Sequence, residues 1–174
     1  MAVTDNTGSK TIIFNAIPGT IEEFKALPEA QLASPYDTAA LTMLALYLFP
    51  TNKDLCFKAL DFLRSPRPMT ERDRQFVSDR FRGKEYMLGS YFAGAAQDNG
   101  YKPSEPLTIT IRIGNRTTND DTMTVLNVTS SGCDPEAAAR PLTLRLAKDG
   151  KWYAWEYSSV MLGIKQPASA DPWA

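Results

Sequence analysis

The spacing of the apolar residues changes at about residue 106, and this change constrains the fold more than any other feature of the sequence. Before it, apolar side chains recur at helical spacing, as they do in residues 52–63. After it, apolar and polar residues alternate, which is typical of a strand buried on one face. The first alternating apolar set is Leu107, Ile109, Ile111 and Ile113. We therefore expect an α+β fold, with N-terminal helices packed on one face of a C-terminal four-stranded antiparallel meander sheet.

Local start signals define the expected helices. Ser34 can cap a helix in which Pro35 takes the first position. Residues 39–49 of this helix are almost all apolar, so we expect it to be the central and most buried one. A capping box formed by Thr70 and Asp73 starts a later helix, which Gly83 ends.

Two segments are ambiguous. Residues 85–96 fit either a short helix or a strand, and we interpret them as a helix. The β-branched and aromatic run Thr11–Phe14 fits either an edge strand or a pinned extended segment.

The last hairpin turns at Asp149-Gly150, and its loop length decides which side chains share a face. A three-residue loop would pair Leu142 with Glu156 and so place a carboxylate on the apolar face. We therefore expect a two-residue loop, which leaves Trp152 and Arg145 on the polar face. The expected pairs are Leu146 with Tyr153, Leu144 with Trp155, and Leu142 with Tyr157.

Length and charge limit the domain organisation and the partners. The 174 residues and 43% hydrophobic content suit a polar leader, residues 1–10, and a single domain, residues 11–174. The leader lacks the features of a signal peptide, so we expect a cytoplasmic protein. The apolar run 39–50 is shorter than the roughly 20 residues of a membrane span, so no membrane contact is expected. A net charge of -1 gives no general reason to expect nucleic acid as a partner.

The residue types present exclude several chemistries. The sequence contains no histidine, which removes the commonest general base and the commonest transition-metal ligand. Its two cysteines, Cys56 and Cys133, are far apart. We therefore expect no metal and no cofactor, and the sequence assigns no catalytic residue.

The strongest local charge lies in residues 64–84, which hold seven basic and three acidic residues. One interpretation is a phosphate or nucleic-acid site, which would need the arginines on one face together with aromatic residues. The alternative is a solvated helix whose acidic residues pair with its arginines. We favour the alternative.

Several short motifs together resemble an uncharacterised family of bacterial proteins over roughly residues 34–174. They are Ser34-Pro35-Tyr36-Asp37-Thr38-Ala39-Ala40, Ser90-Tyr91-Phe92, Asn99-Gly100-Tyr101, Arg140-Pro141, Lys151-Trp152-Tyr153 and Asp171-Pro172-Trp173-Ala174. The resemblance implies a bacterial cytoplasmic setting and no residue roles.

The function that we expect is a non-catalytic interaction or ligand-binding module whose partner is a protein or a small molecule. The alternative is a small-molecule enzyme with a cone-type α+β pocket and no histidine chemistry; a deep polar pocket between helices and sheet would favour it. The candidate interaction surface is Trp152, Arg145 and Trp173. We expect Trp173 to dock on its own domain, because burying an indole stabilises a tail.

Overall fold

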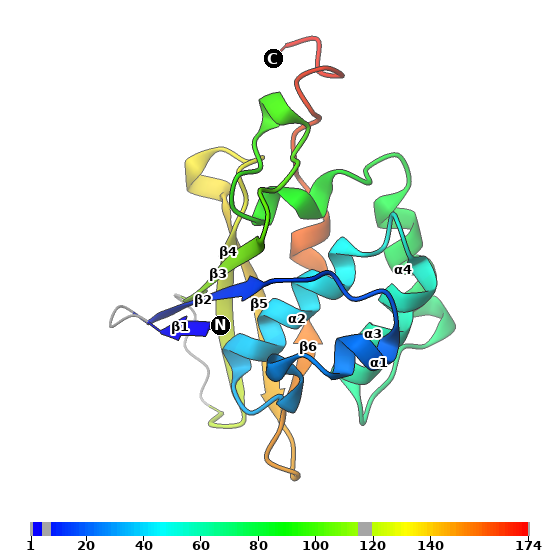
Figure 1. The fold of residues 1–174 in the computed structure, drawn as a ribbon, viewed down its shortest axis with the longest axis vertical. Helices are drawn as coiled ribbons and strands as arrows, with labels where there is room; N and C mark the ends of the chain where they lie inside the picture. The colour runs from blue at the N-terminus through cyan, green and yellow to red at the C-terminus, as the bar shows by residue number, and fades with distance from the viewer. Residues whose placement is uncertain (1, 5–7, 115–119, 174) are drawn as a thin grey trace.

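The computed structural model describes residues 2–4, 8–114 and 120–173, and it has an antiparallel sheet with helices on one side (Figure 1). In this part of the chain six strands pair in sequential order, each antiparallel to the next. They are β1 (Ala2–Thr4), β2 (Ser9–Phe14), β3 (Leu107–Ile113), β4 (Met123–Thr129), β5 (Ala139–Leu146) and β6 (Trp152–Glu156). The α+β class and the antiparallel meander are confirmed. The sheet is larger than expected, because β1 and β2 precede the helices.

Residues Thr11–Phe14 belong to β2, which pairs with β1 on one side and with β3 on the other. The segment is therefore an inner strand and not an edge strand. Its Ile12 and Phe14 are buried, which explains why this short run is so apolar.

Four helices lie between β2 and β3 in the described chain. They are α1 (Ile21–Lys25), α2 (Pro35–Tyr47), α3 (Lys53–Arg64) and α4 (Glu71–Phe81). Helix α2 packs against strands β2 to β6, and α3 packs on α2 (Figure 1). None of the helices in the described residues combines the length and the apolar character needed to cross a membrane.

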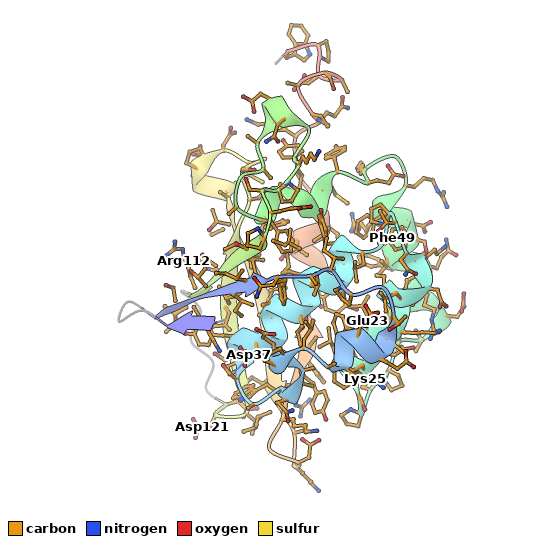
Figure 2. All side chains as sticks on the ribbon, viewed as in Figure 1. Glu23, Lys25, Asp37, Phe49, Arg112 and Asp121 are labelled. Atoms are coloured by element: carbon orange, nitrogen blue, oxygen red, sulfur yellow. The ribbon has the colours of Figure 1, made fainter. Side chains whose placement is uncertain are left out.

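Helix α2 is central, as its composition predicts. The Ser34 side chain accepts a hydrogen bond from the Tyr36 amide at 3.2 Å, and Pro35 begins the helix. Every residue from Thr38 to Leu46 is buried. Beyond the end of α2, the ring of Phe49 stacks on Phe81 of α4 at 4.4 Å between centroids, which joins the helices on the right of the view (Figure 2).

The helix expected over residues 85–96 is wrong. Only a single 3₁₀ turn forms, Met87–Tyr91, and the chain is extended at Phe92. Two backbone hydrogen bonds, each of 2.9 Å, tie this segment to the sheet: the Ala93 amide donates to the Thr108 carbonyl of β3, and the amide of Ser131, just after β4, donates to the Ser90 carbonyl. Pairing with the sheet therefore overrides the helical spacing.

The two-residue loop expected for the β5–β6 hairpin is also wrong. Ala147 and Lys151 close a three-residue loop, in which Gly150 has a φ of +80°. Leu146 then pairs with Trp152, and Thr143 pairs with Glu156 across a register shift. The shift makes Trp155 the extra residue of a bulge, so Tyr157 is still buried and Glu156 stays exposed.

The C-terminal tail is held by hydrogen bonds to Gln97 and not by its tryptophan. The Ala168 amide donates to the Gln97 carbonyl at 2.9 Å, and the Gln97 side-chain amide donates to Asp171 at 3.1 Å. The Trp173 side chain is 93% exposed, so the expected docking of this indole is wrong. The bonds to Gln97 direct the last residues away from the domain, at the top of the view (Figure 1).

Candidate functional site

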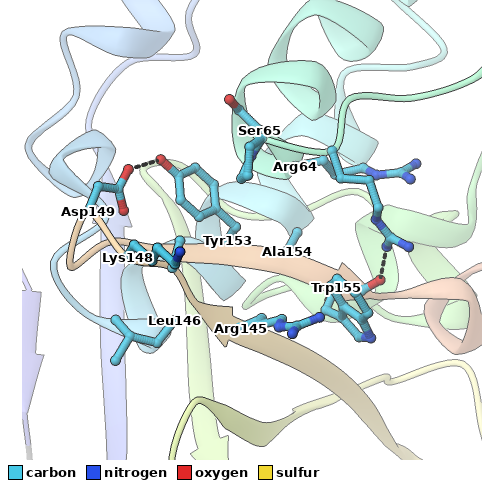
Figure 3. A pocket seen from close by; sticks show the side chains of 12 residues that line it. Arg64, Ser65, Arg145, Leu146, Lys148, Asp149, Tyr153, Ala154 and Trp155 are labelled. Atoms are coloured by element: carbon cyan, nitrogen blue, oxygen red, sulfur yellow. Dashed lines mark hydrogen bonds between the residues drawn. The ribbon is translucent and has the colours of Figure 1, made fainter.

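A surface cleft of about 560 Å³ lies between the β5–β6 hairpin and the linker that joins α3 to α4 (Figure 3). Arg145, Tyr153 and Trp155 line its hairpin side, and Arg64 and Ser65 line the opposite wall. We call it the arginine cleft and define it by Arg64, Arg67, Arg145, Lys148, Tyr153 and Trp155.

The linker wall is fixed by one carboxylate of α3. Asp61 accepts a hydrogen bond from the Met69 amide at 2.9 Å, and its other oxygen pairs with Arg74 of α4 at 3.0 Å. These two contacts hold the end of the linker and the start of α4 against α3. Arg67 lies within this linker, opposite the hairpin.

The hairpin wall depends on the bulge, because a bulge can turn a side chain away from the face that regular alternation would give it. The guanidinium carbons of Arg67 and Arg145 lie 4.0 and 4.4 Å from the Trp155 ring centroid. Arg67 also donates to the Trp155 carbonyl at 3.3 Å. One indole thus holds two guanidinium groups by cation–π contacts.

Arg64 is the buried cation of the site, with a side chain that is only 9% exposed. It pairs with Asp73 at 3.2 Å and donates to the Tyr157 hydroxyl at 3.4 Å. Its Nε is buried and has no hydrogen-bond partner among the described residues. Since a guanidinium carries five N–H donors, Arg64 has donors to spare.

The acidic residues around α4 compensate part of the basic stretch, as the favoured interpretation predicts. Arg74 pairs with Asp61, and Arg82 pairs with Asp79. Arg67, Arg72 and Arg80 form no ion pair within the described chain, and neither do the other two exposed cations of the cleft, Arg145 and Lys148. Arg145 does have a carboxylate nearby, because its charge, after the hydrogen bonds from Thr122, helps to lower the pKa of Asp120.

The cleft therefore carries an excess of positive charge, although Arg64 is paired with Asp73. Four cations line it, and Asp149 is the one carboxylate among its lining residues. Asp149 is itself engaged, because it accepts a hydrogen bond of 2.6 Å from the Tyr153 hydroxyl (Figure 3). The arrangement favours a ligand that carries negative charge.

The Asp149–Tyr153 contact predicts a pH dependence. The hydrogen bond from Tyr153 lowers the pKa of Asp149, while burial and the same bond raise the pKa of Tyr153 to about 12. The stabilisation from Asp149 is complete above its unfolded pKa and is lost as pH falls through the lower folded value. The contribution of Tyr153 is lost as pH rises through about 12.

We expect Tyr153→Phe to raise the Asp149 midpoint toward that of an ordinary aspartate, measured by a carboxyl carbon NMR titration. Asp120, whose pKa is lowered first by the hydrogen bonds from Thr122, serves as the internal reference, and its midpoint should be the same in both proteins. An unchanged Asp149 midpoint in the variant would contradict the assigned contact.

The sequence-predicted interaction residues do not form one surface. Arg145 lies in the cleft. Trp152 pairs with Leu146 and packs against the hydrophobic core, so it does not lie on the polar face. Trp173 is in the tail, at the end of the molecule opposite the hairpin tip (Figure 1). Sequence reasoning missed Trp155, and the conflict between the two hairpin registers was the signal for a bulge that could have found it.

Other reactive groups suggest little chemistry. Burial raises the pKa of Cys56 to about 12, so its thiolate is disfavoured. Cys133 is partly buried and accepts a hydrogen bond from Arg140 at 3.1 Å. Among the residues that the structure describes, no three acidic or cysteine side chains are grouped in a way that could hold a metal ion.

Fold and site together define an α+β domain with an antiparallel meander sheet and a cationic surface cleft. The chain belongs to the family described as Domain of unknown function (DUF6935), whose model matches residues 16–168. This confirms the resemblance to an uncharacterised family, although the match begins earlier than expected and ends at residue 168, before the Asp171-Pro172-Trp173-Ala174 motif. No curated protein matches the chain, and no solved structure matches it.

Proposed function

We propose that residues 11–174 act as a non-catalytic binding module whose ligand is an anion held in the arginine cleft. The observation that carries the proposal is a group of three exposed cations, Arg67, Arg145 and Lys148, which form no ion pair among the described residues and line one cleft together with the half-buried Trp155. Carboxylate and phosphate groups accept strong, charge-assisted hydrogen bonds from guanidinium groups. Negative charge in the ligand would also offset the repulsion among the cations.

The filled interior supports binding over catalysis. The cone-type enzyme would need a pocket between the helices and the sheet. Side chains from both layers, such as Leu44 of α2, Ile109 of β3 and Leu142 of β5, instead belong to one buried cluster. The arginine cleft lies outside this cluster, at the edge of the sheet.

The partner that we propose is a protein or a small molecule, and not nucleic acid or a membrane. Three arginines of residues 64–84, Arg64, Arg74 and Arg82, pair with carboxylates, and the chain has a net charge of -1. Both features argue against the extended basic surface that binds a phosphate backbone. The resemblance to bacterial proteins supports a bacterial cytoplasmic setting.

The test is an NMR titration with citrate and with inorganic phosphate at low ionic strength. The chain has three tryptophans, so Trp155→Phe assigns the indole N–H resonance of the cleft. We expect the Trp155 resonance to shift progressively while that of the distant Trp173 does not. Arg145→Gln should weaken binding of the anion about tenfold, since hydrogen bonds to charged groups are worth at least 1.5 kcal/mol.

Arg82→Gln is the matched control, because Arg82 is exposed, lies outside the cleft and pairs with Asp79. It removes the same charge and should leave the titration unchanged. If both substitutions weakened anion binding equally, the effect would come from the net charge of the protein and not from the cleft. No shift of Trp155 with either anion would overturn the proposed function.

A further inference from the structure

The arginine cleft adjoins a second hollow, of about 380 Å³, at the start of α4. Arg64, Arg67 and Trp155 line both hollows, so the two meet at the contact between Arg67 and Trp155, and we treat them as one groove. We call the second part the Phe76 hollow and define it by Asp73, Phe76, Val77, Glu156 and Tyr157. The groove is open to solvent along both parts, which suits an extended chain better than an enclosed small molecule.

The two ends of the groove differ in chemistry. Both carboxylates of the Phe76 hollow are engaged: Asp73 pairs with Arg64, and Glu156 accepts a hydrogen bond from the Ser158 amide at 2.8 Å. Phe76 also lines this hollow and is 39% exposed, with the guanidinium carbon of Arg80 4.8 Å from its ring centroid. One end thus attracts negative charge, and the other offers the part of the Phe76 ring that Arg80 leaves open.

The side chains along the groove are those that dominate protein–protein binding. Tryptophan, tyrosine and arginine are enriched among residues that contribute most to such interfaces. The groove brings together Arg64, Arg67, Arg145, Tyr153, Trp155 and Tyr157. Several of them already hold one another in place, so little conformational entropy is lost when a partner binds.

The edge of β6 is not free to pair with a further strand. The Trp152 amide donates to the Leu32 carbonyl at 2.9 Å, and the Trp152 carbonyl accepts from the Thr38 hydroxyl at 2.8 Å. Further along, Arg67 donates to the Trp155 carbonyl. A bound segment is therefore recognised by its side chains and not by strand addition.

We propose, building on the proposed function, that the ligand is an acidic, extended segment of a partner protein. Its carboxylates lie in the arginine cleft against Arg67, Arg145 and Lys148. A neighbouring apolar side chain of the same segment packs on Phe76. Charge complementarity favours the carboxylates in the arginine cleft, and the exposed part of the Phe76 ring favours the apolar side chain beside it.

The probes are four synthetic peptides, acetyl-Glu-Glu-(Gly)n-Leu-amide with zero to three glycines, titrated into the full chain by calorimetry or NMR. We expect one spacing to bind about tenfold more tightly than the same peptide with leucine replaced by serine, as the burial of a leucine predicts. Phe76→Ser should abolish this tenfold gain and leave the contribution of the glutamates unchanged. Arg145→Gln should weaken the contribution of the glutamates and leave the tenfold gain from leucine unchanged.

Leu162→Ser is the control for exposed apolar area, because Leu162 is 38% exposed and lies outside the groove. Thermal melts of every variant show that the protein is folded. If leucine and serine peptides bind equally at all four spacings while citrate still binds, the ligand is a small polyanion confined to the cleft, and this inference fails. If neither citrate nor any peptide binds, the proposed function itself fails.

Discussion

Leu44→Ala should destabilise the domain by about 3–4 kcal/mol, the usual range for a fully buried leucine. Leu44 is 0% exposed in the middle of α2, which packs against five strands and α3. The truncation removes buried apolar surface and leaves a cavity that the packed neighbours cannot fill. The melting temperature should fall by roughly 10 °C, measured by circular dichroism, and the urea midpoint should fall with it.

Leu162→Ala tests whether position or residue type causes the loss. Its side chain is 38% exposed, so the same truncation should cost less than about 1 kcal/mol. A similar loss in both variants would contradict the central position of α2.

Gly89→Ala should destabilise the domain by on the order of 3 kcal/mol or prevent folding, although it adds a single methyl group. A Cβ at this position would overlap the backbone oxygen of Tyr101 and lie 3.3 Å from its carbonyl carbon. Backbone atoms cannot move aside as a flexible side chain can. The 3₁₀ turn Met87–Tyr91 would therefore have to separate from the segment that contains Tyr101.

Gly19→Ala provides the matched comparison. The nearest atom to a Cβ at Gly19 is the flexible carboxylate of Glu23, at 3.9 Å. We expect its melting temperature to stay within about 2–3 °C of the parent, as for an unstrained surface substitution. If the two variants have the same melting temperature, the backbone of Tyr101 does not lie as close to Gly89 as the structure places it.

The helices that could be predicted are those whose signals are local. Thr70 and Asp73 form the expected capping box, with the Asp73 amide donating to the Thr70 hydroxyl at 3.2 Å and Asp73 accepting from the Thr70 amide at 2.8 Å. Ser34 and Pro35 likewise begin α2. Such contacts join residues two or three positions apart, so the sequence itself contains both partners.

The hairpin and the segment 85–96 could not be predicted, because their conformations depend on distant partners. The argument against a three-residue loop assumed regular pairing, whereas one bulge at Trp155 reconciles that loop with a buried Tyr157. In residues 85–96, the bond from Ala93 to Thr108 of β3 competes with a helical bond and prevails. Local residue spacing predicts neither the bulge nor the bond between Ala93 and Thr108.

The sequence by itself determined the α+β class, the antiparallel meander and the burial of α2. The physical reason is that apolar periodicity specifies which side of an element faces the core, whatever that core contains. Only the tertiary structure decided the site. Arg64 and Arg67 meet Arg145 and Lys148 because the α3–α4 linker folds over the β5–β6 hairpin, and the bulge places Trp155 between Arg67 and Arg145. Charge and exposure depend on distances between side chains far apart in the chain, and periodicity does not specify those distances.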